Sequence, residues 1–554
     1  MNTLQTPDYI VFLVYFVIVA GYGLWIYNRK KAESANSKDY FLAEGSLTWW
    51  AIGASLIASN ISAEQFIGMS GAGFTLGLAI ATYEWMAAAT LIIVAVFFIP
   101  VYLKNKIFTM PQFLSQRYNE TVAMIMAVFW LLLYVVVNLT SILFLGALAV
   151  SSISGINFTA CMVGLAVFSI VITLGGMKVI GYTDVIQVFV LILGGLATTY
   201  LALDLVAVHY GDTGVISGLS HLTSQADEHF HMIFTKDNPN YIDLPGLTVL
   251  VGGMWIVNLN YWGCNQYITQ RALGADLKTA RAGILFAAFL KLLMPIIVVL
   301  PGIAAYLLYK QEVFSSEMLI NGKVNPDSAY PVLLNLLPTG LKGLSFAALT
   351  AAVVASLAGK ANSIATIFTL DVYKKVFNKD ASEKNQVLTG KITIVAVMVL
   401  AVIIAPFLGI EKGGFKYIQE YTGFVSPGIF AMFILGFFWK RTTSSAALFA
   451  TIGGFFLSVI LKFLPLWTDL SFLYPMGFAV PLDGVYEIPF LDRMGFVFLF
   501  CIIGMYLISI TENKNSVNPK GLEIDSSMFK TTSGFAVGSM LIIGILVALY
   551  TAFW

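Results

Sequence analysis

Long apolar segments, separated by short polar loops, run through the whole chain. Each has about twenty or more mostly apolar residues, the length that a helix needs to cross the hydrocarbon of a bilayer. The pattern predicts fourteen membrane-spanning helices and hence an all-α membrane protein. They are expected near residues 9–28, 47–73, 78–103, 120–151, 156–177, 181–204, 246–265, 280–309, 338–373, 387–408, 416–438, 443–464, 493–511 and 532–553.

The second apolar segment, Trp50–Gly77, is interrupted by a polar run from Ser59 to Gln65. A lipid-facing helix cannot carry such an interruption, because hydrocarbon offers no partner for freed backbone or amide groups. A helix that breaks around a buried site can, since its unwound carbonyl groups can coordinate a cation and its polar side chains can face a substrate. The segment is typical of the broken helix of a secondary transporter.

Basic residues are distributed unevenly between alternate loops. If Met1 lies outside, 21 of the 31 Lys and Arg residues fall in cytoplasmic loops or at the cytoplasmic ends of spans, whereas Lys291 and Lys360 lie deep within spans. This bias follows the positive-inside rule, and an odd number of spans would remove it. Both termini are therefore expected on the external side of the bacterial inner (plasma) membrane.

Composition supports this class and argues against others. The chain is 58% hydrophobic and 11% charged, whereas soluble proteins carry about 25% charged residues. The net charge of +1 gives no electrostatic reason to expect a nucleic-acid partner. No motif of an ATP-driven pump or a hydrolase is found, so an enzyme is not expected. Cys161, Cys264 and Cys501 lie in apolar segments and are expected to be packed thiols rather than disulfides.

The longest loop, Asp204–Pro245, is predicted to be external and contains all four histidines: His209, His221, His229 and His231. A metal site at His229 and His231 finds no support from a cysteine or an HExxH spacing. A solvated loop is expected instead.

Polar residues inside the predicted spans are costly there and are usually functional. Those that stand out are Gln65, Glu84, Asn258, Asn260, Tyr261, Trp262, Lys291, Gln419 and Glu420. A carboxylate, an ammonium, several amides and aromatic rings suit a neutral polyhydroxyl ligand, because polar groups satisfy hydroxyls and an aromatic face covers a pyranose ring. The alternative is that Glu84 and Lys291 pair only to brace the bundle.

Seven motifs carry a family resemblance. They are ASLIASNISAEQFIGMSG (54–71), ATYEWM (81–86), YTDVIQV (182–188), NYWGCNQYITQR (260–271), FAAFLK (286–291), ANSIATIFTLDVY (361–373) and YIQEYTG (417–423). With these motifs in this order, the chain resembles the solute:sodium symporter family, in its SGLT branch, nearly end to end.

The resemblance implies a LeuT-type fold, in which two inverted five-helix repeats form the core. The repeats are expected at 47–204 and 246–438, with the external loop 205–245 between them. A first peripheral helix and a cytoplasmic loop (1–46) precede the core, and three peripheral helices (439–554) follow it.

The resemblance also implies the positions of the sugar site and its gates. The sugar site is expected at Gln65, Glu84, Asn258, Lys291 and Gln419. The inner gate is expected at Tyr261, beside Trp262, and the outer gate at Met69, Tyr83 and Phe415. Ala87 and Asn260 stand where a serine and a tyrosine are expected, so the choice of hexose stays open.

For Na⁺, the resemblance implies carbonyl ligands from Ala58, Ile61 and Ala352 and two hydroxyl ligands from the positions of Ala355 and Ser356. Ala355 replaces one expected serine. A hard cation prefers several oxygen ligands, so this loss is expected to weaken Na⁺ binding.

Lys360 stands where an apolar residue is expected, four residues after Ser356 on the same helix face. Its side chain could snorkel to the cytoplasmic face. It could pair with Asp184, which the resemblance implicates in cation passage, while Na⁺ still binds. Or its ammonium could replace Na⁺, leaving a uniporter or a proton-coupled carrier.

The sequence thus predicts a secondary active transporter of a neutral hexose, of glucose or galactose type, that works by alternating access with Na⁺ as the coupling ion. A Na⁺-independent sugar carrier and a sugar sensor on the same scaffold are the alternatives, and no segment resembles the signalling domain that a sensor should carry. The expected partners are the sugar and the lipid bilayer.

Overall fold

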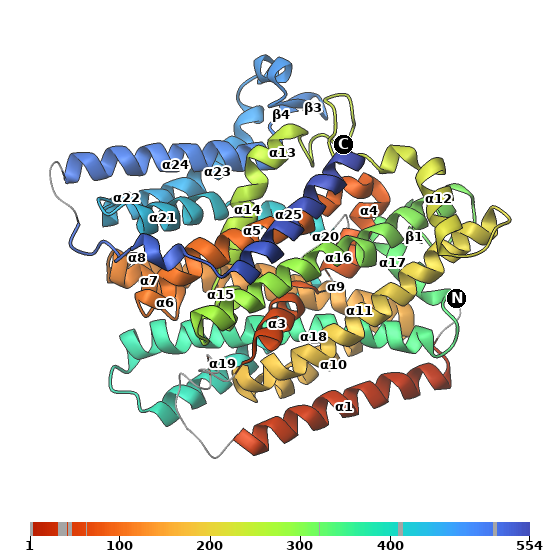
Figure 1. The fold of residues 1–554 in the computed structure, drawn as a ribbon, viewed down its shortest axis with the longest axis horizontal. Coiled ribbons are helices and arrows are strands. Elements are labelled where there is room, and N and C mark those ends of the chain that lie inside the picture. The colour runs from red at the N-terminus through yellow and green to blue at the C-terminus, as the bar shows by residue number, and fades with distance from the viewer. Residues whose placement is uncertain are drawn as a thin grey trace.

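The protein is a bundle of long helices that lie roughly alongside one another (Figure 1). The computed structural model describes residues 4–30, 41, 47–62, 64–320, 322–407, 414–513 and 518–554. Within them, ten helices are long and apolar enough to cross a membrane. They are Thr6–Asn28, Glu64–Lys104, Glu120–Ser154, Gly176–His209, Leu277–Lys310, Leu341–Phe377, Glu383–Phe407, Ser444–Leu466, Phe490–Glu512 and Ser533–Ala552. The all-helical class agrees with the prediction, while the count of fourteen spans stays a prediction.

Several of these runs consist of two or three helical segments. The first half of the chain contains α1 (Thr6–Lys30), α3 (Trp49–Asn60), α4 (Ser70–Leu76), α5 (Thr82–Ile93), α6 (Ile99–Lys104), α7 (Met110–Arg117), α8 (Glu120–Leu132), α9 (Thr140–Ser154), α10 (Phe158–Thr173), α11 (Gly176–His209), α12 (Val215–Gln225), α13 (Leu247–Val251), α14 (Gly253–Gly263) and α15 (Gln266–Leu273). Short π-helical segments continue some of them, including Glu64–Met69, which precedes α4, and Leu133–Leu139, which joins α8 to α9.

The second half contains α16 (Leu277–Lys310), α17 (Ala329–Asn335), α18 (Leu341–Ile367), α19 (Glu383–Ile404), α20 (Gly414–Gly423), α21 (Ser426–Phe438), α22 (Ser444–Leu448), α23 (Gly454–Phe463), α24 (Phe490–Glu512) and α25 (Ser533–Ala552). The π-helical segment Phe368–Phe377 extends α18. The loops also contain two small antiparallel hairpins. One pairs β1 (Leu319–Ile320) with β2 (Lys323–Val324), and the other pairs β3 (Val480–Leu482) with β4 (Val485–Glu487).

Polar side chains define the first residues of several helices, which the apolar pattern alone does not define. Asn119, Asp276 and Ser382 each accept a hydrogen bond from a backbone amide in the first turn of α8, α16 and α19. Such caps satisfy amide groups that have no partner inside the helix. Sequence-local chemistry therefore sets where these helices begin.

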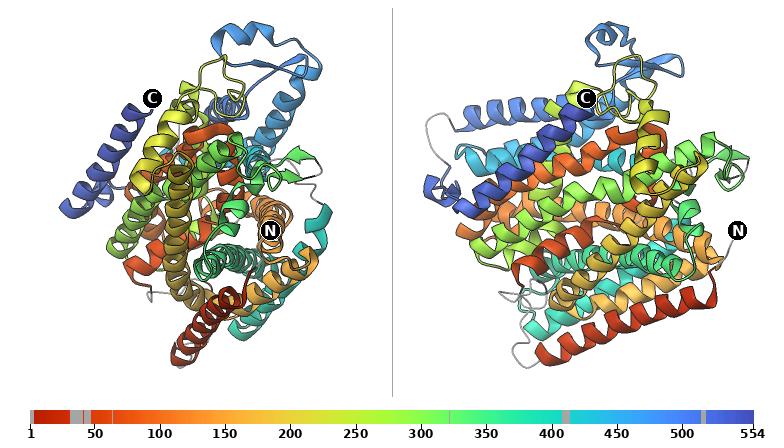
Figure 2. Two further views of the ribbon diagram at one scale, coloured as in Figure 1. Left: turned by 90° about the vertical axis from the view of Figure 1, so that its right-hand side faces the viewer. Right: turned by 45° about the vertical axis from the view of Figure 1, so that its right-hand side comes forward.

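The core lies around α16 and α18, with α1 and α24 at opposite edges of the bundle (Figures 1 and 2). Glycines allow the backbone of α16 to come into contact with the backbone of the broken helix, α3 and α4. A Cβ atom added to Gly53 of α3 would lie 2.7 Å from the carbonyl oxygen of Gly283, and one added to Gly302 would lie 2.1 Å from that of Ser70. Both distances are too short for a side chain, so α3 and α4 each touch α16 through its backbone. The predicted packing of the three cysteines is confirmed, because all three are buried free thiols.

Both chain ends lie on one face of the bundle, which also carries α12 and the β1–β2 hairpin and is named here the α12 face. Near the N-terminus, a carboxylate oxygen of Asp8 accepts hydrogen bonds from the backbone amides of Gly340 and Gly343 at 2.7 and 3.0 Å. Near the C-terminus, the carbonyl of Phe553 accepts one from Met232 at 2.7 Å. An even number of spans requires this arrangement; which side of the membrane the α12 face meets stays a prediction.

The segment between α11 and α13 is more ordered than the solvated loop that the sequence predicted. It contains α12, and His229 is buried, with its Nε2 donating to the carbonyl oxygen of Phe74 at 3.0 Å. The imidazole also stacks on Tyr306, with 3.8 Å between ring centres. Burial lowers the pKa of His229, so the imidazole that packs here is neutral. The expectation of a solvated histidine was wrong at this position, because α4 and α16 cover it.

Candidate functional site

The predicted break in the second apolar segment is present. Helix α3 ends at Asn60, and Ile61 has an extended backbone with φ −84° and ψ 115°. Gln65 holds the break in place, since its side-chain carbonyl accepts hydrogen bonds from the backbone amide and the hydroxyl of Ser62 at 2.9 and 3.3 Å. The Ser62 hydroxyl in turn accepts one from the amide of Glu64 at 3.1 Å. The polar residues that interrupt the apolar pattern therefore satisfy the backbone that the break exposes.

Beside the break lies a buried ion pair. Lys291 of α16 places its ammonium nitrogen 2.5 Å from a carboxylate oxygen of Glu84 of α5, and the two side chains are 1% and 4% exposed. The same ammonium donates to the side-chain oxygen of Asn60 and lies 5.2 Å from the ring centre of Trp262. Three predicted residues thus converge, with Asn60 as their link to the end of α3.

The predicted inner gate joins the same network. The amide of Asn60 donates to the hydroxyl of Tyr261 at 3.0 Å, and that hydroxyl is also hydrogen-bonded to the hydroxyl of Tyr267 in α15. The sequence had not singled out Asn60 or Tyr267. Both residues carry polar atoms within apolar segments, which could have marked them as candidates for the site. Their partners lie on other helices, so spacing along one helix could not have predicted these contacts.

Two other polar residues of the predicted spans, Asn258 and Glu420, have partners away from the ion pair. Asn258 donates to the carbonyl of Met254 in its own helix at 3.1 Å. Glu420 faces the peripheral helices, where Arg493 and Lys462 lie 2.9 and 2.7 Å from one carboxylate oxygen. Among the described residues, no hydrogen bond joins Asn258 or Gln419 to the ion pair. Their place in a sugar site stays a prediction.

Asn260 connects α14 to the break between α20 and α21. Its side-chain amide donates to the hydroxyl of Ser426 at 3.1 Å. Its side-chain oxygen is buried and has no hydrogen-bond partner within the described part of the chain. Asn260 therefore has an acceptor to offer a ligand. Its helix α14 packs against α5, on which Ala87 is buried.

Two of the three predicted outer-gate residues contact each other. The rings of Tyr83 and Phe415 meet edge to face, with 5.0 Å between their centres, and Met69 is buried. Tyr83 and Phe415 also line a cavity of about 250 Å³ that reaches Asp327 and Lys416. The role of these rings as an outer gate stays a prediction.

The predicted cation ligands meet where α18 passes the break. The hydroxyl of Ser356 lies 3.3, 3.0 and 3.3 Å from the carbonyl oxygens of Ala58, Ser59 and Ile61. Ala352 lies one turn earlier on the same buried helix. Backbone carbonyls and a hydroxyl are the neutral oxygen ligands that suit a hard cation such as Na⁺. The residues present therefore fit the implied ion.

The two residues predicted for the ion path are both buried, but they do not pair with each other as one hypothesis proposed. Asp184 accepts a hydrogen bond from the hydroxyl of Ser55 at 2.5 Å, and Ser55 also accepts bonds from Arg271 at 2.9 and 3.1 Å. Lys360 is 3% exposed, so the snorkelling interpretation is wrong. Its ammonium lies 4.7 Å from the ring centre of Tyr267.

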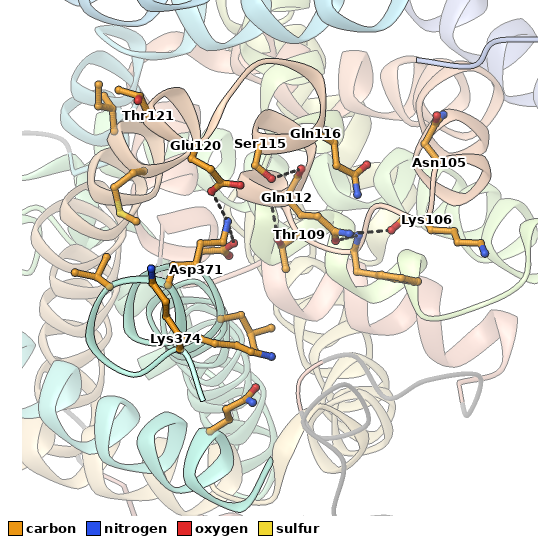
Figure 3. A pocket seen from close by; sticks show the side chains of 18 of the residues that line it. Asn105, Lys106, Thr109, Gln112, Ser115, Gln116, Glu120, Thr121, Asp371 and Lys374 are labelled. Carbon is orange, nitrogen blue, oxygen red and sulfur yellow. Dashed lines mark hydrogen bonds and ion pairs between the residues drawn. The ribbon is translucent and has the colours of Figure 1, made fainter. Parts of the chain in front are cut away.

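A larger cavity opens on the opposite side of the bundle, beside α7, where sequence reasoning predicted none. Figure 3 shows Glu120, Asp371 and several lysines around it. Lys375 bridges the two carboxylates, with distances of 3.0 Å to Glu120 and 3.7 Å to Asp371. The lysines Lys374 and Lys379 also line it. None of these residues belongs to the predicted sugar or cation site.

Comparison with known proteins gives consistent matches. The model of the sodium:solute symporter family matches residues 40–454. A sodium/glucose cotransporter of Vibrio parahaemolyticus is 45% identical over 99% of this chain and 98% of its own length. A human sodium/myo-inositol cotransporter 2 is 33% identical over 82% of this chain and 70% of its own length.

Two solved structures share the fold at low sequence identity. A Na⁺-coupled sialic acid symporter in a substrate-bound outward-open state superposes with a TM-score of 0.76 at 21% identity, covering 93% of this chain and 99% of that one. A transporter of the nucleobase-cation-symport-1 family superposes with a TM-score of 0.50 at 15% identity, covering 90% and 98%. At these identities the likeness shows the fold alone.

Proposed function

The chain belongs to the sodium:solute symporter family, and we propose that it carries a neutral hexose across the membrane together with Na⁺. The relative that is 45% identical over nearly the whole length is a sodium/glucose cotransporter. The more distant human relative is a sodium/myo-inositol cotransporter. Glucose and inositol are both neutral, ring-shaped polyols, which is the chemical class that the buried polar residues suit.

One observation carries the proposal: residues predicted for the cation site and residues predicted for the sugar site both contact the end of α3. The carbonyls of Ala58, Ser59 and Ile61 face Ser356. Asn60, in the middle of these residues, bonds to Lys291 and to Tyr261. An ion that orders these carbonyls therefore also orders the side chain that holds the sugar-site lysine and the inner gate. Such a shared element gives Na⁺ and sugar a reason to favour each other's binding.

Each partner has a distinct task in this mechanism. Glu84 and Lys291 offer an acceptor and a donor to sugar hydroxyls, and Trp262 and Tyr261 offer aromatic faces to the sugar ring. The ring pair of Tyr83 and Phe415 closes the external route. Na⁺, when bound, supplies the electrochemical driving force. Alternating access then requires the two gates to open in turn.

We also propose the finer architecture. Every one of the fourteen apolar segments contains helix, and the long run Glu64–Lys104 contains a break at Gly77, where φ is +67°. A residue other than glycine would be strained at this positive φ. Its side chain would also clash with the carbonyl oxygen of His229. This break supports two spans within the run. The fold likeness to Na⁺-coupled symporters supports two inverted repeats at 47–204 and 246–438, with the α12 face and both termini external.

Uptake into proteoliposomes tests the function. Labelled glucose and galactose are offered under separate inward gradients of Na⁺, K⁺ and protons. Na⁺-driven accumulation of at least one hexose above its external concentration is expected, and Ser356→Ala should reduce it by removing the hydroxyl that faces the three carbonyls. Accumulation driven equally by K⁺ or protons, or uptake that never exceeds equilibrium, would contradict Na⁺ symport.

A further inference from the structure

Lys360 places a buried positive charge beside the cation site. We propose that this ammonium balances the carboxylate of Glu64 and thereby weakens Na⁺ binding, and that it holds Tyr267 against the inner gate. The inference rests on the proposed Na⁺ symport and concerns the regulation of that same site. It assigns roles to Lys360, Glu64 and Tyr267 that follow from the burial of the two charged side chains and from the contact of Lys360 with the ring of Tyr267.

The first step is the position of the charge. Lys360 lies one helical turn beyond Ser356 on α18, a rise of about 6 Å along the axis. Its side chain is 3% exposed, so water does not screen it. A positive charge so close to three carbonyls that suit a cation raises the electrostatic cost of placing Na⁺ there.

The second step is the partner of that charge. Glu64 lies just after the break that Ser356 faces, and Ser356 lies one turn from Lys360, so a buried carboxylate and a buried ammonium lie on either side of the same break. Glu64 begins the helical segment that follows the break, and it is buried. Its Oε1 atom has no hydrogen-bond partner among the residues that the structure describes. A buried carboxylate is costly without a compensating positive charge, so Lys360 stabilises it.

Two further charged residues, Arg271 and Asp184, belong to the same buried group as Lys360 and Glu64. Arg271 of α15 packs directly against α18 beside Lys360, because a Cβ atom on Gly359 would lie 2.4 Å from its guanidinium. Asp184 of α11 faces Arg271 through Ser55. The group of Lys360, Arg271, Glu64 and Asp184 thus contains two basic and two acidic side chains, whose charges cancel when all four are ionised. With an apolar residue at position 360, the group would carry one unbalanced negative charge, which Na⁺ could neutralise.

The ammonium of Lys360 also contacts the predicted inner gate through Tyr267. The ammonium of Lys360 lies over the ring of Tyr267 at 4.7 Å, a distance at which a cation is attracted to an aromatic face. The hydroxyl of Tyr267 is bonded to that of Tyr261, which also accepts a hydrogen bond from Asn60. Lys360 is thus a positioning residue for the predicted inner gate. A Na⁺ ion that repels this ammonium also disturbs the contact that fixes Tyr267.

The test is the half-saturating Na⁺ concentration, measured both by hexose uptake in proteoliposomes and by the Na⁺-dependent thermal shift of the purified protein without sugar. Lys360→Met should lower it at least tenfold, because the competing charge is gone. Adding Glu64→Gln to that variant should raise it again at least fivefold, because the unbalanced carboxylate is gone too. Lys360→Arg keeps the charge and should stay within about threefold of the parent. Lys374→Met, at an exposed lysine on the extension of α18, is the matched control and should behave as the parent.

The gate has its own readout. Tyr267→Phe keeps the ring for Lys360 but removes the hydroxyl that holds Tyr261. It should speed sugar efflux from Na⁺-free proteoliposomes while leaving the half-saturating Na⁺ concentration in the thermal-shift assay within about threefold of the parent. Unchanged efflux would overturn the gate role of this contact.

The outcomes separate this inference from the proposed function. A Na⁺-dependent parent whose half-saturating Na⁺ concentration is unchanged in Lys360→Met overturns the inference and leaves Na⁺ symport standing. A Na⁺-independent parent that becomes Na⁺-dependent in Lys360→Met supports the inference and overturns Na⁺ symport for the native chain. If Lys360→Met does not fold, Glu64→Gln in the parent decides: it should raise the half-saturating Na⁺ concentration at least tenfold, and no change would overturn the inference.

Discussion

Breaking the buried pair of Glu84 and Lys291 should destabilise the protein, whichever partner is removed. In the variant Glu84→Gln the shape of the side chain is kept and its charge is lost, so the ammonium of Lys291 remains buried without its carboxylate. Removing one partner of a buried pair costs about 3–5 kcal/mol. Lys291 keeps its bond to Asn60 and the ring of Trp262 at 5.2 Å, so the lower end, about 3 kcal/mol, is expected.

The double variant Glu84→Gln/Lys291→Met separates structure from function. It removes both charges, so its thermal stability in detergent should recover above that of Glu84→Gln alone. Glucose binding by calorimetry should be lost in the single and double variants alike, because the carboxylate of Glu84 that accepts from the sugar is absent from both. Glu420→Gln is the control for removing a carboxylate away from this pair: it is 20% exposed and its partner Lys462 is 31% exposed, so water replaces part of the lost contacts and the loss of stability should be smaller than in Glu84→Gln. If the double variant regains sugar binding with stability, the pair only braces the bundle, and its assignment to the sugar site is wrong.

Three further outcomes are expected. Gln419→Ala should weaken hexose binding by about 1–3 kcal/mol in calorimetry, the cost of leaving a buried partner unpaired; unchanged affinity would remove this residue from the site. Ala87→Ser with Asn260→Tyr should change the ratio of glucose to galactose uptake in competition assays, and an unchanged ratio would show that these positions do not set selectivity. Because burial lowers the pKa of His229, its neutral form adds stability above the unfolded value of about 6.5, and this is lost as pH falls. Amide hydrogen exchange around Phe74 should therefore increase on acidification in the parent but not in His229→Phe, and equal increases in both would contradict this.

The sequence predicted the architecture well where a local pattern has only one physical solution. Polar residues between Ser59 and Gln65 inside an apolar span can survive only at a break, and the break is there. The oppositely charged Glu84 and Lys291 could not remain unpaired in a membrane, and they are paired. Ser356 and the carbonyls of the break also came together, although that prediction came from the family resemblance.

The contacts that the sequence could not predict depend on which helices cross. Lys360 was placed on the face of Ser356, but its side chain lies over Tyr267, which belongs to α15 and is distant in the chain. Asp184 meets Arg271 through Ser55, so one residue on α3 decides the partner of another on α11. The spacing of residues within one helix cannot predict contacts with other helices. The burial of His229 could not be predicted for the same reason, because the helices that cover it are distant in the chain.

The backbone contacts of α16 have a consequence for the substrate range. The two halves of the broken helix are held against α16 by close contacts at Gly53, Gly283 and Gly302, where an added Cβ atom would meet the backbone of the facing helix. The width of the space at the break is thus fixed by atoms that no ligand can reach. Alanine at Gly302 would push α4 outward and widen this space. A search for variants that accept bulkier sugars should therefore include these glycines as well as the residues that line the pocket.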